Sequence, residues 1–155
     1  MKNKLIFVLY VDGVLTTGQF LYSADGKAYK IFGAHDADGL KMLKGLLPII
    51  LMTADKRGFP ISRKRARDMG LPIELVSEEE RLAHIEKKYG LDNVIFMGDG
   101  YHDAPILKAC LFGIAPAIAR KEARAAADFV TESKAGEGAV LDACLKIRKK
   151  FFSSE

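Results

Sequence analysis

Short runs of apolar residues alternate along the chain with segments in which apolar residues recur every three or four positions. The first pattern is typical of buried strands and the second of amphipathic helices, and Gly or Pro marks the joins. The predicted strands are Leu5–Val11, Pro48–Met52, Ile73–Val76, Val94–Met97, Gly113–Ala115 and Asp128–Val130. The predicted helices are Asp38–Leu46, Ile61–Met69, Glu78–Tyr89, Ala104–Ala109, Lys121–Ala126 and Gly138–Lys149.

This alternation predicts an α/β fold: a doubly wound, mainly parallel sheet covered by helices on both faces. The length of 155 residues suits a single domain, 1–155. Two helices carry start signals. The stretch Ser77–Glu80 has the spacing of a capping box, and Pro105 lies in the first turn after Asp103.

The carboxyl ends of parallel strands meet at one edge of a sheet, and ligands bind beyond that edge. Asp12, Thr53 and Ser77 each follow a predicted strand directly, and Asp99 follows one after a single glycine. We expect these four polar residues to share this rim.

One segment, Gln19–Phe32, breaks the alternation and reads as a β-hairpin that turns at Ala24-Asp25-Gly26. It contains six large apolar residues, and an isolated hairpin is only marginally stable. We therefore expect it to pack on its own domain or on another subunit.

Composition narrows the class of protein. The formal net charge is +4 and the pI about 9.0, which raises the question of a polyanion partner. The densest basic cluster, Ser62–Asp68, spreads its charges over several faces of a predicted helix, so nucleic-acid binding is the weaker interpretation. No apolar run is long enough to cross a membrane, and Cys110 and Cys144 form no metal or disulfide pattern. We expect a cytoplasmic protein without membrane contact.

Four short motifs follow the predicted strands in a fixed order: Tyr10-Val11-Asp12, Thr53, Arg81 and Gly98–Asp103. This order resembles the haloacid dehalogenase superfamily of phosphatases, and within it the small, cap-less, tetrameric 3-deoxy-D-manno-octulosonate 8-phosphate phosphatase family. The likeness covers nearly the whole chain. The segments that carry it are Tyr10–Thr16, the hairpin Gln19–Phe32, Asp36–Lys41, Thr53, Arg81, Gly98–Asp103, Ala126–Thr131 and Gly136–Val140.

The resemblance implies a role for each rim residue. Position 10 would carry the attacking group, and Asp12 would donate a proton to the leaving group. The group at position 10, the backbone carbonyl of Asp12 and the Asp99 side chain would hold Mg²⁺, and Asp103 would be a further ligand or orient the other ligands. Thr53 and the backbone N–H of Ala54 would hold the phosphate, and Arg81 would neutralise it. The resemblance also implies a small phosphorylated sugar as substrate and a homotetramer built through the hairpin, here called the flap.

Plainer interpretations stay open for single residues. Asp12-Gly13 is a common turn, Thr53 could simply end a strand, and Asp103 could cap a helix. Arg81 could lie on the surface of a charged helix. We expect His102 in an exposed loop, and His35 and His84 in structural or solvated positions.

Three of the motifs depart from the family pattern. Tyr10 stands where the family has its attacking aspartate, and a phenol, with a pKa of about 10, is neutral at pH 7. The usual Thr-Gly-Arg is here Thr53-Ala54-Asp55, and the usual third-motif lysine is Arg81. The pattern favours a catalytically impaired homologue with a structural or regulatory role and with weakened or lost Mg²⁺ binding. The alternative is an active Mg²⁺-dependent phosphomonoesterase acting on a sugar phosphate.

Overall fold

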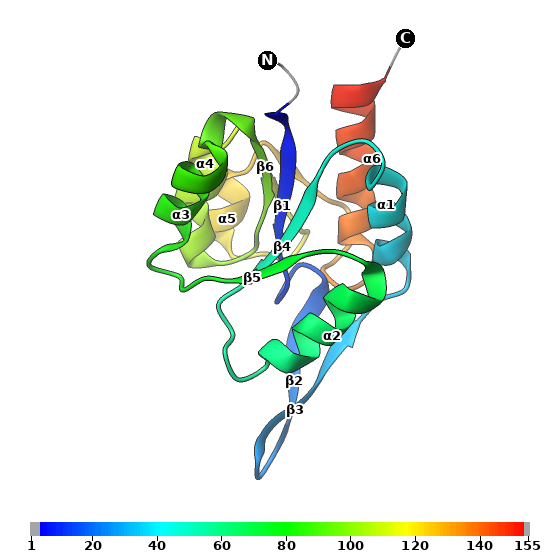
Figure 1. Cartoon of the computed structure of the whole chain (residues 1–155), viewed down its shortest axis with the longest axis vertical. Helices are drawn as coiled ribbons and strands as arrows, with labels where there is room; N and C mark the ends of the chain where they lie inside the picture. Colours follow the sequence, from blue (N-terminus) through cyan, green and yellow to red (C-terminus); the bar gives the residue numbers. More distant parts are fainter. Residues whose placement is uncertain (1–3, 154–155) are drawn as a thin grey trace.

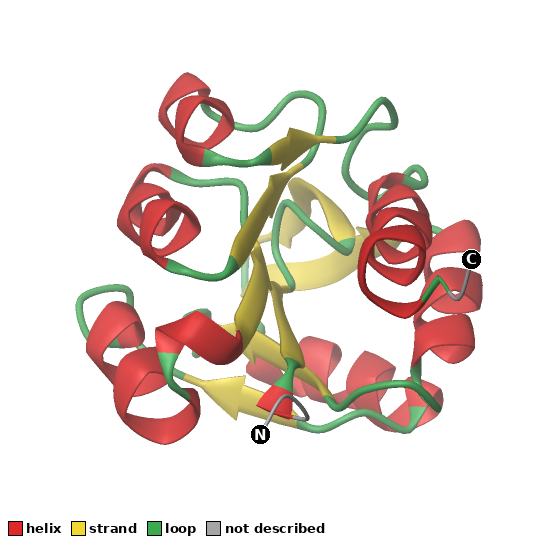
Figure 2. Ribbon diagram, turned by 90° about the horizontal axis from the view of Figure 1, so that it is seen from above, coloured by secondary structure: helices red, strands yellow, loops and turns green. Residues whose placement is uncertain are grey.

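A six-stranded parallel sheet forms the centre of the computed structural model, which describes residues 4–153 (Figures 1 and 2). The strand order is β5-β4-β1-β6-β7-β8, and every pairing in this sheet is parallel. The strands are β1 (Ile6–Tyr10), β4 (Ile49–Thr53), β5 (Ile73–Leu75), β6 (Val94–Met97), β7 (Phe112–Ala115) and β8 (Phe129–Val130). The doubly wound α/β fold predicted from the sequence is confirmed.

Helices cover both faces of the sheet. Figure 1 shows α3, α4 and α5 on one side of it and α1, α2 and α6 on the other. Their bounds are α1 (His35–Leu43), α2 (Phe59–Met69), α3 (Arg81–Tyr89), α4 (Ala104–Ala109), α5 (Lys121–Ala126) and α6 (Ala139–Phe152). In the described part of the chain, no helix is long and apolar enough to cross a membrane.

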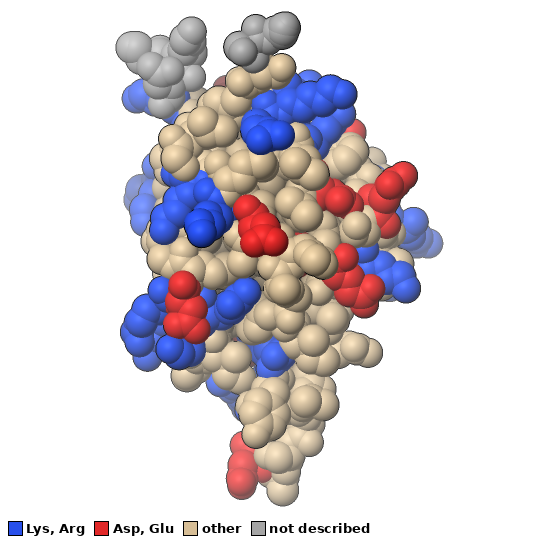
Figure 3. Space-filling model, turned by 90° about the vertical axis from the view of Figure 1, so that its right-hand side faces the viewer, with Lys and Arg blue, Asp and Glu red and all other residues tan. Residues whose placement is uncertain are grey.

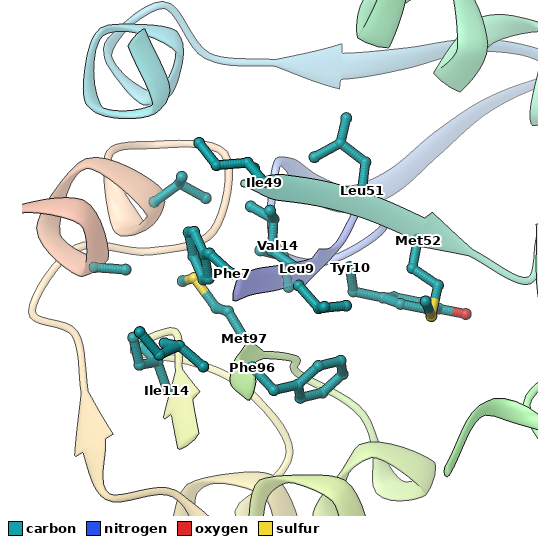
Figure 4. Packing of buried hydrophobic residues seen from close by; sticks show 14 of the residues in the cluster. Phe7, Leu9, Tyr10, Val14, Ile49, Leu51, Met52, Phe96, Met97 and Ile114 are labelled. Atoms are coloured by element: carbon teal, nitrogen blue, oxygen red, sulfur yellow. The ribbon is translucent and has the colours of Figure 1, made fainter. Parts of the chain in front are cut away.

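The central strand β1 is buried along its whole length, because it pairs with β4 on one side and β6 on the other. Phe7, Leu9, Phe96 and Met97 are fully buried around it. Figure 4 shows the Tyr10 ring extending from the end of this core, with its hydroxyl at the end farthest from Phe7. The packing thus fixes where position 10 presents its side chain.

Two helix starts differ from the sequence prediction by three residues. Helix α1 begins at His35, three residues before the predicted Asp38. Helix α3 begins at Arg81 rather than Glu78, so the capping-box prediction is wrong. The Glu80 N–H donates to the Ser77 carbonyl at 3.2 Å, which forms a turn before the helix, and no side chain caps α3. Pro105 does lie in the first turn of α4, as predicted.

The flap hairpin is present and consists of β2 (Thr16–Ser23) and β3 (Gly26–Phe32), paired antiparallel. It projects from the carboxyl edge of the sheet (Figure 1), and in Figure 3 its outer part is mostly tan, whereas Lys, Arg, Asp and Glu are intermixed over the body. Five large apolar side chains of the flap are exposed: Phe20, Leu21, Tyr22, Tyr29 and Ile31. The flap therefore leaves much of its apolar surface uncovered by its own chain.

Candidate active site

The carboxyl ends of β1, β4 and β6 bring the predicted site residues together. Tyr10 ends β1 and Thr53 ends β4. Asp99 follows β6 after one glycine, and Arg81 begins α3. Contacts link these residues into one network, so residues far apart in the sequence share a single rim.

The Tyr10 hydroxyl is the acceptor at the centre of this network. The backbone N–H of Ala54 donates to it at 2.9 Å, and Nη2 of Arg81 donates at 2.6 Å. Burial raises the pKa of the Tyr10 phenol above its ordinary value, and nearby Asp103 and Glu78 act in the same direction against Arg81 and the Ala54 N–H. The side chain is therefore a neutral phenol at physiological pH.

Arg81 joins Tyr10 to Asp103. Its Nη1 forms an ion pair with Asp103 Oδ1, and both side chains are only 2% exposed. Asp103 Oδ2 accepts the backbone N–H groups of Asp99 at 3.0 Å and Gly100 at 2.9 Å. Burial raises the pKa of Asp103, while Arg81 and these N–H groups oppose that rise.

Asp12 is held by two partners, one of which the sequence interpretation missed. Its Oδ1 lies 2.7 Å from Nζ of Lys30, and its Oδ2 accepts the Thr53 hydroxyl at 3.1 Å. Lys30 comes from β3 of the flap, and its side chain is fully buried, with a further hydrogen bond of 2.8 Å to Ser62. Successive side chains of a strand point to opposite faces, so Lys30 shares the inner face of β3 with Ala28 and Phe32. This alternation is the sequence signal that could have identified Lys30 as a buried residue.

Asp55, the acid in place of the family's cation, faces two flap lysines. Its Oδ2 lies 2.8 Å from Nζ of Lys27 and 3.0 Å from Nζ of Lys30. Burial would raise the Asp55 pKa, but hydrogen bonds from Lys27, the Gly58 N–H and Lys30 outweigh it and lower the pKa to about 2. The charge reversal at position 55 is thus compensated from the flap, whereas Lys56 is exposed.

Asp99 lies against the turn that follows β1. A Cβ atom at Gly13, whose φ is +80°, would lie 1.9 Å from Asp99 Oδ2, so only glycine fits there. Burial raises the pKa of Asp99 to about 7, and the charges of Asp103 and Asp12 add to this rise while Arg81 opposes it.

Several plainer interpretations can now be compared with the geometry. Arg81 is buried rather than on the surface. Asp103 makes no side-chain cap on α4 and closes the loop before it instead. Thr53 does end a strand, and its hydroxyl also contacts Asp12. Among the histidines, His102 is exposed and His84 pairs with Glu74 at 2.9 Å.

The expected Mg²⁺ ligands are the group at position 10, the backbone carbonyl of Asp12, Asp99 and Asp103. Both side-chain oxygens of Asp103 already have protein partners, and the side chain at position 10 is a neutral phenol rather than a carboxylate. Within residues 4–153, no group of three or more His, Cys, Asp or Glu side chains is arranged to hold a metal ion. The expected donor set does not fit Mg²⁺ in this arrangement.

A pocket of about 440 Å³ opens beside this network. Its lining combines the core of the site with the flap and the turn before α3: Tyr10, Asp12, Phe20, Lys27, Ala54, Asp55, Ser77, Glu78 and Glu79. The rim can therefore admit a small molecule, and the Tyr10 ring forms part of the wall.

Comparisons with known proteins agree with the class that the fold and rim define. The haloacid dehalogenase-like hydrolase family matches residues 79–143. The chain is 32% identical to the 3-deoxy-D-manno-octulosonate 8-phosphate phosphatase of Haemophilus influenzae, over 90% of this chain and 79% of the relative.

Two solved structures of such phosphatases share the fold. The cobalt-bound Haemophilus influenzae protein has a TM-score of 0.83 and 30% identity, covering 96% of this chain and 89% of that one. A Moraxella catarrhalis protein in complex with magnesium, phosphate and KDO has a TM-score of 0.83 and 28% identity, covering 96% of this chain and 88% of that one. This chain belongs to the 3-deoxy-D-manno-octulosonate 8-phosphate phosphatase family of haloacid dehalogenase-like hydrolases.

Proposed function

We propose that this chain is a catalytically impaired member of its family that acts as a structural or regulatory homologue. One observation carries the proposal: the Tyr10 hydroxyl accepts hydrogen bonds from the Ala54 N–H and from Arg81. These are two of the donors that the family resemblance assigns to phosphate. In this chain the side chain at the nucleophile position takes up the donors that a substrate would need.

The chemistry of Tyr10 supports the same conclusion. Attack on a doubly charged phosphomonoester needs an electron-rich oxygen, and a carboxylate supplies one at neutral pH. Burial raises the phenol pKa, so the reactive phenolate is scarcer than in free tyrosine. Asp12, the expected proton donor, already has both oxygens engaged by Lys30 and Thr53.

The alternative is an active, metal-dependent phosphomonoesterase on a sugar phosphate of the 3-deoxy-octulosonate 8-phosphate type. Its support is family membership, the retained Asp12, Thr53, Asp99 and Asp103, and the pocket of about 440 Å³ at the rim. In this case a divalent cation, as in the metal-bound relatives, would have to displace protein contacts of Asp103.

Phosphate release from a panel of sugar phosphates with Mg²⁺ separates the two functions. We expect the purified protein and its Tyr10→Phe variant to release no phosphate above the protein-free background. Turnover by the original protein that disappears in Tyr10→Phe would assign Tyr10 as a nucleophile and overturn the impaired function. Turnover that persists in Tyr10→Phe would overturn it as well and would assign the reaction to another group.

The supporting role would be exerted through an assembly formed by the flap, for which we propose the family's homotetramer. Five apolar side chains on β2 and β3 support this, since each is at least 38% exposed in the described chain. Lys27 and Lys30 attach the flap to its own rim through Asp55 and Asp12, so the flap is presented in a fixed position.

A further inference from the structure

We infer that the Arg81 guanidinium acts as a built-in cation that replaces the divalent metal ion at this site, so that the chain is a metal-independent member of a metal-binding family. The inference deepens the proposed function and rests on it in one respect, since both require Arg81 to stay bound to Tyr10. It concerns charge balance at the rim carboxylates rather than the fate of a substrate.

Asp103 is the first part of the argument. Its two oxygens are taken by Arg81 and by the backbone N–H groups of Asp99 and Gly100. The pair is buried, so the guanidinium is poorly screened by water and its charge acts strongly on the neighbouring space. Arginine does not lose its proton in proteins, so an arriving metal ion cannot discharge it.

The Tyr10 side chain supplies contacts that hold the Arg81 guanidinium beside Asp103. The guanidinium is a planar fork, and here it reaches Asp103 with Nη1 and the Tyr10 hydroxyl with Nη2. Its carbon atom also lies 4.0 Å from the centre of the Tyr10 ring, within the range of a cation–π contact. A carboxylate at position 10 would bring a second negative charge instead of a neutral acceptor and a ring face. The departures from the family pattern at positions 10 and 81 therefore form one complementary pair.

Asp12 and Asp55 complete the charge balance. Lys30 contacts both carboxylates and Lys27 contacts Asp55. Three carboxylates of the site, on Asp12, Asp55 and Asp103, thus face three protein cations. Of the two expected carboxylate ligands that the chain retains, Asp103 is paired with Arg81, and Asp99 makes no side-chain ion pair with these cations. A hard divalent cation prefers several oxygen ligands, and the remaining set is too small.

Mn²⁺ binding, followed by the electron paramagnetic resonance signal of the free ion, tests the inference without any substrate. The measured quantity is Asp99-dependent binding: the ions bound by the full chain minus those bound by its Asp99→Asn variant. We expect this difference to be zero for the natural sequence. We also expect Mg²⁺ and EDTA to leave its melting temperature unchanged relative to Asp99→Asn.

The Tyr10→Asp/Arg81→Lys double variant is the positive control for metal binding, because it restores the family's residues at both positions. We expect it to bind about one Mn²⁺ per chain in an Asp99-dependent way and to melt several degrees higher with Mg²⁺. Tyr10→Asp alone provides a second variant in case the double variant does not fold, because it restores the carboxylate at position 10 and keeps the Arg81–Asp103 ion pair. Binding by the natural sequence, or no gain in the folded variants, would overturn the inference.

The proposed function can fail separately. Phosphate release by the natural sequence without bound Mn²⁺ would overturn the impaired function and leave this inference intact. Mn²⁺ binding without phosphate release would overturn this inference and leave the impaired function intact.

Discussion

The Arg81 guanidinium lies over the ring of Tyr10, 4.0 Å from its centre, and donates to the Tyr10 hydroxyl at 2.6 Å. Both side chains are buried at the rim, at 2% and 7% exposure. Position 10 is the expected nucleophile and position 81 the expected phosphate-binding cation. Two of the residues whose identities differ from the family pattern are thus in direct contact, and their effects should be coupled.

Tyr10→Phe should lower the free energy of unfolding by about 1–3 kcal/mol, because it leaves two buried or half-buried donors without their acceptor. Urea denaturation at fixed protein concentration measures this change. Tyr22→Phe is the matched control, since Tyr22 is 66% exposed on the flap, and a change within about 0.5 kcal/mol is expected for it. Equal effects of the two substitutions would contradict the Tyr10 network.

Arg81→Met should be more damaging, at about 3–5 kcal/mol, because Asp103 would remain buried without its cation. Adding Asp103→Leu to it should recover part of the loss, since the unpaired charge is then gone as well. Arg67→Met on the exposed side of α2 is the control and should change little. Strictly additive effects of the two site substitutions would show that Arg81 and Asp103 are not coupled.

Lys30→Met should destabilise the protein far more than Lys27→Met. The Lys30 side chain is fully buried between Asp12 and Asp55, whereas that of Lys27 is 15% exposed and contacts only Asp55 of these two acids. We expect a loss of about 3–5 kcal/mol for Lys30→Met and about 1 kcal/mol or less for Lys27→Met. Hydrogen exchange should also become faster along β3 in Lys30→Met. Unchanged exchange in the flap would argue against Lys30 as its anchor.

Acid sensitivity should follow from Asp55. Its pKa is lowered from 3.8 to about 2 in the folded protein, so its stabilising contribution is complete above the unfolded value. That contribution is lost as the pH falls from about 4 toward 2. The difference in unfolding free energy between the original protein and Asp55→Asn should therefore shrink over this range. Asp25→Asn, in the exposed turn of the flap, is the control. A difference that grows on acidification would give the wrong sign for a lowered pKa.

Much of the fold could be predicted from the sequence, because the spacing of apolar residues along the chain reflects which positions are buried. The apolar run before Tyr10 forms the central strand, and the rim residues follow the strands as expected. Helix starts were less predictable. Ser77 and Glu80 have capping-box spacing, but the chain makes a turn there, so that α3 begins at Arg81.

The hydrogen bonds and ion pairs of the site could not be predicted, because they join residues that are far apart in the sequence. Lys30 reaches Asp12 and Asp55 only when β3 folds back against the rim. The sequence suggested Lys56 as the cation compensating Asp55, since it is the nearer neighbour, yet it is exposed. Likewise, the sequence left open whether Arg81 faces solvent, and the structure buries it between Tyr10 and Asp103.

The flap should determine the oligomeric state. Leu21 and Tyr22 are 53% and 66% exposed on β2, and covering them by another subunit removes apolar surface from water. We expect an oligomer at micromolar concentration by light scattering, and a smaller species for Leu21→Lys/Tyr22→Lys. Leu111→Lys is the matched control, because Leu111 is 44% exposed and precedes β7, at the edge of the sheet opposite the flap. A monomeric original protein would show that the flap forms no subunit contact. Dissociation by the control substitution alone would place the subunit contact elsewhere.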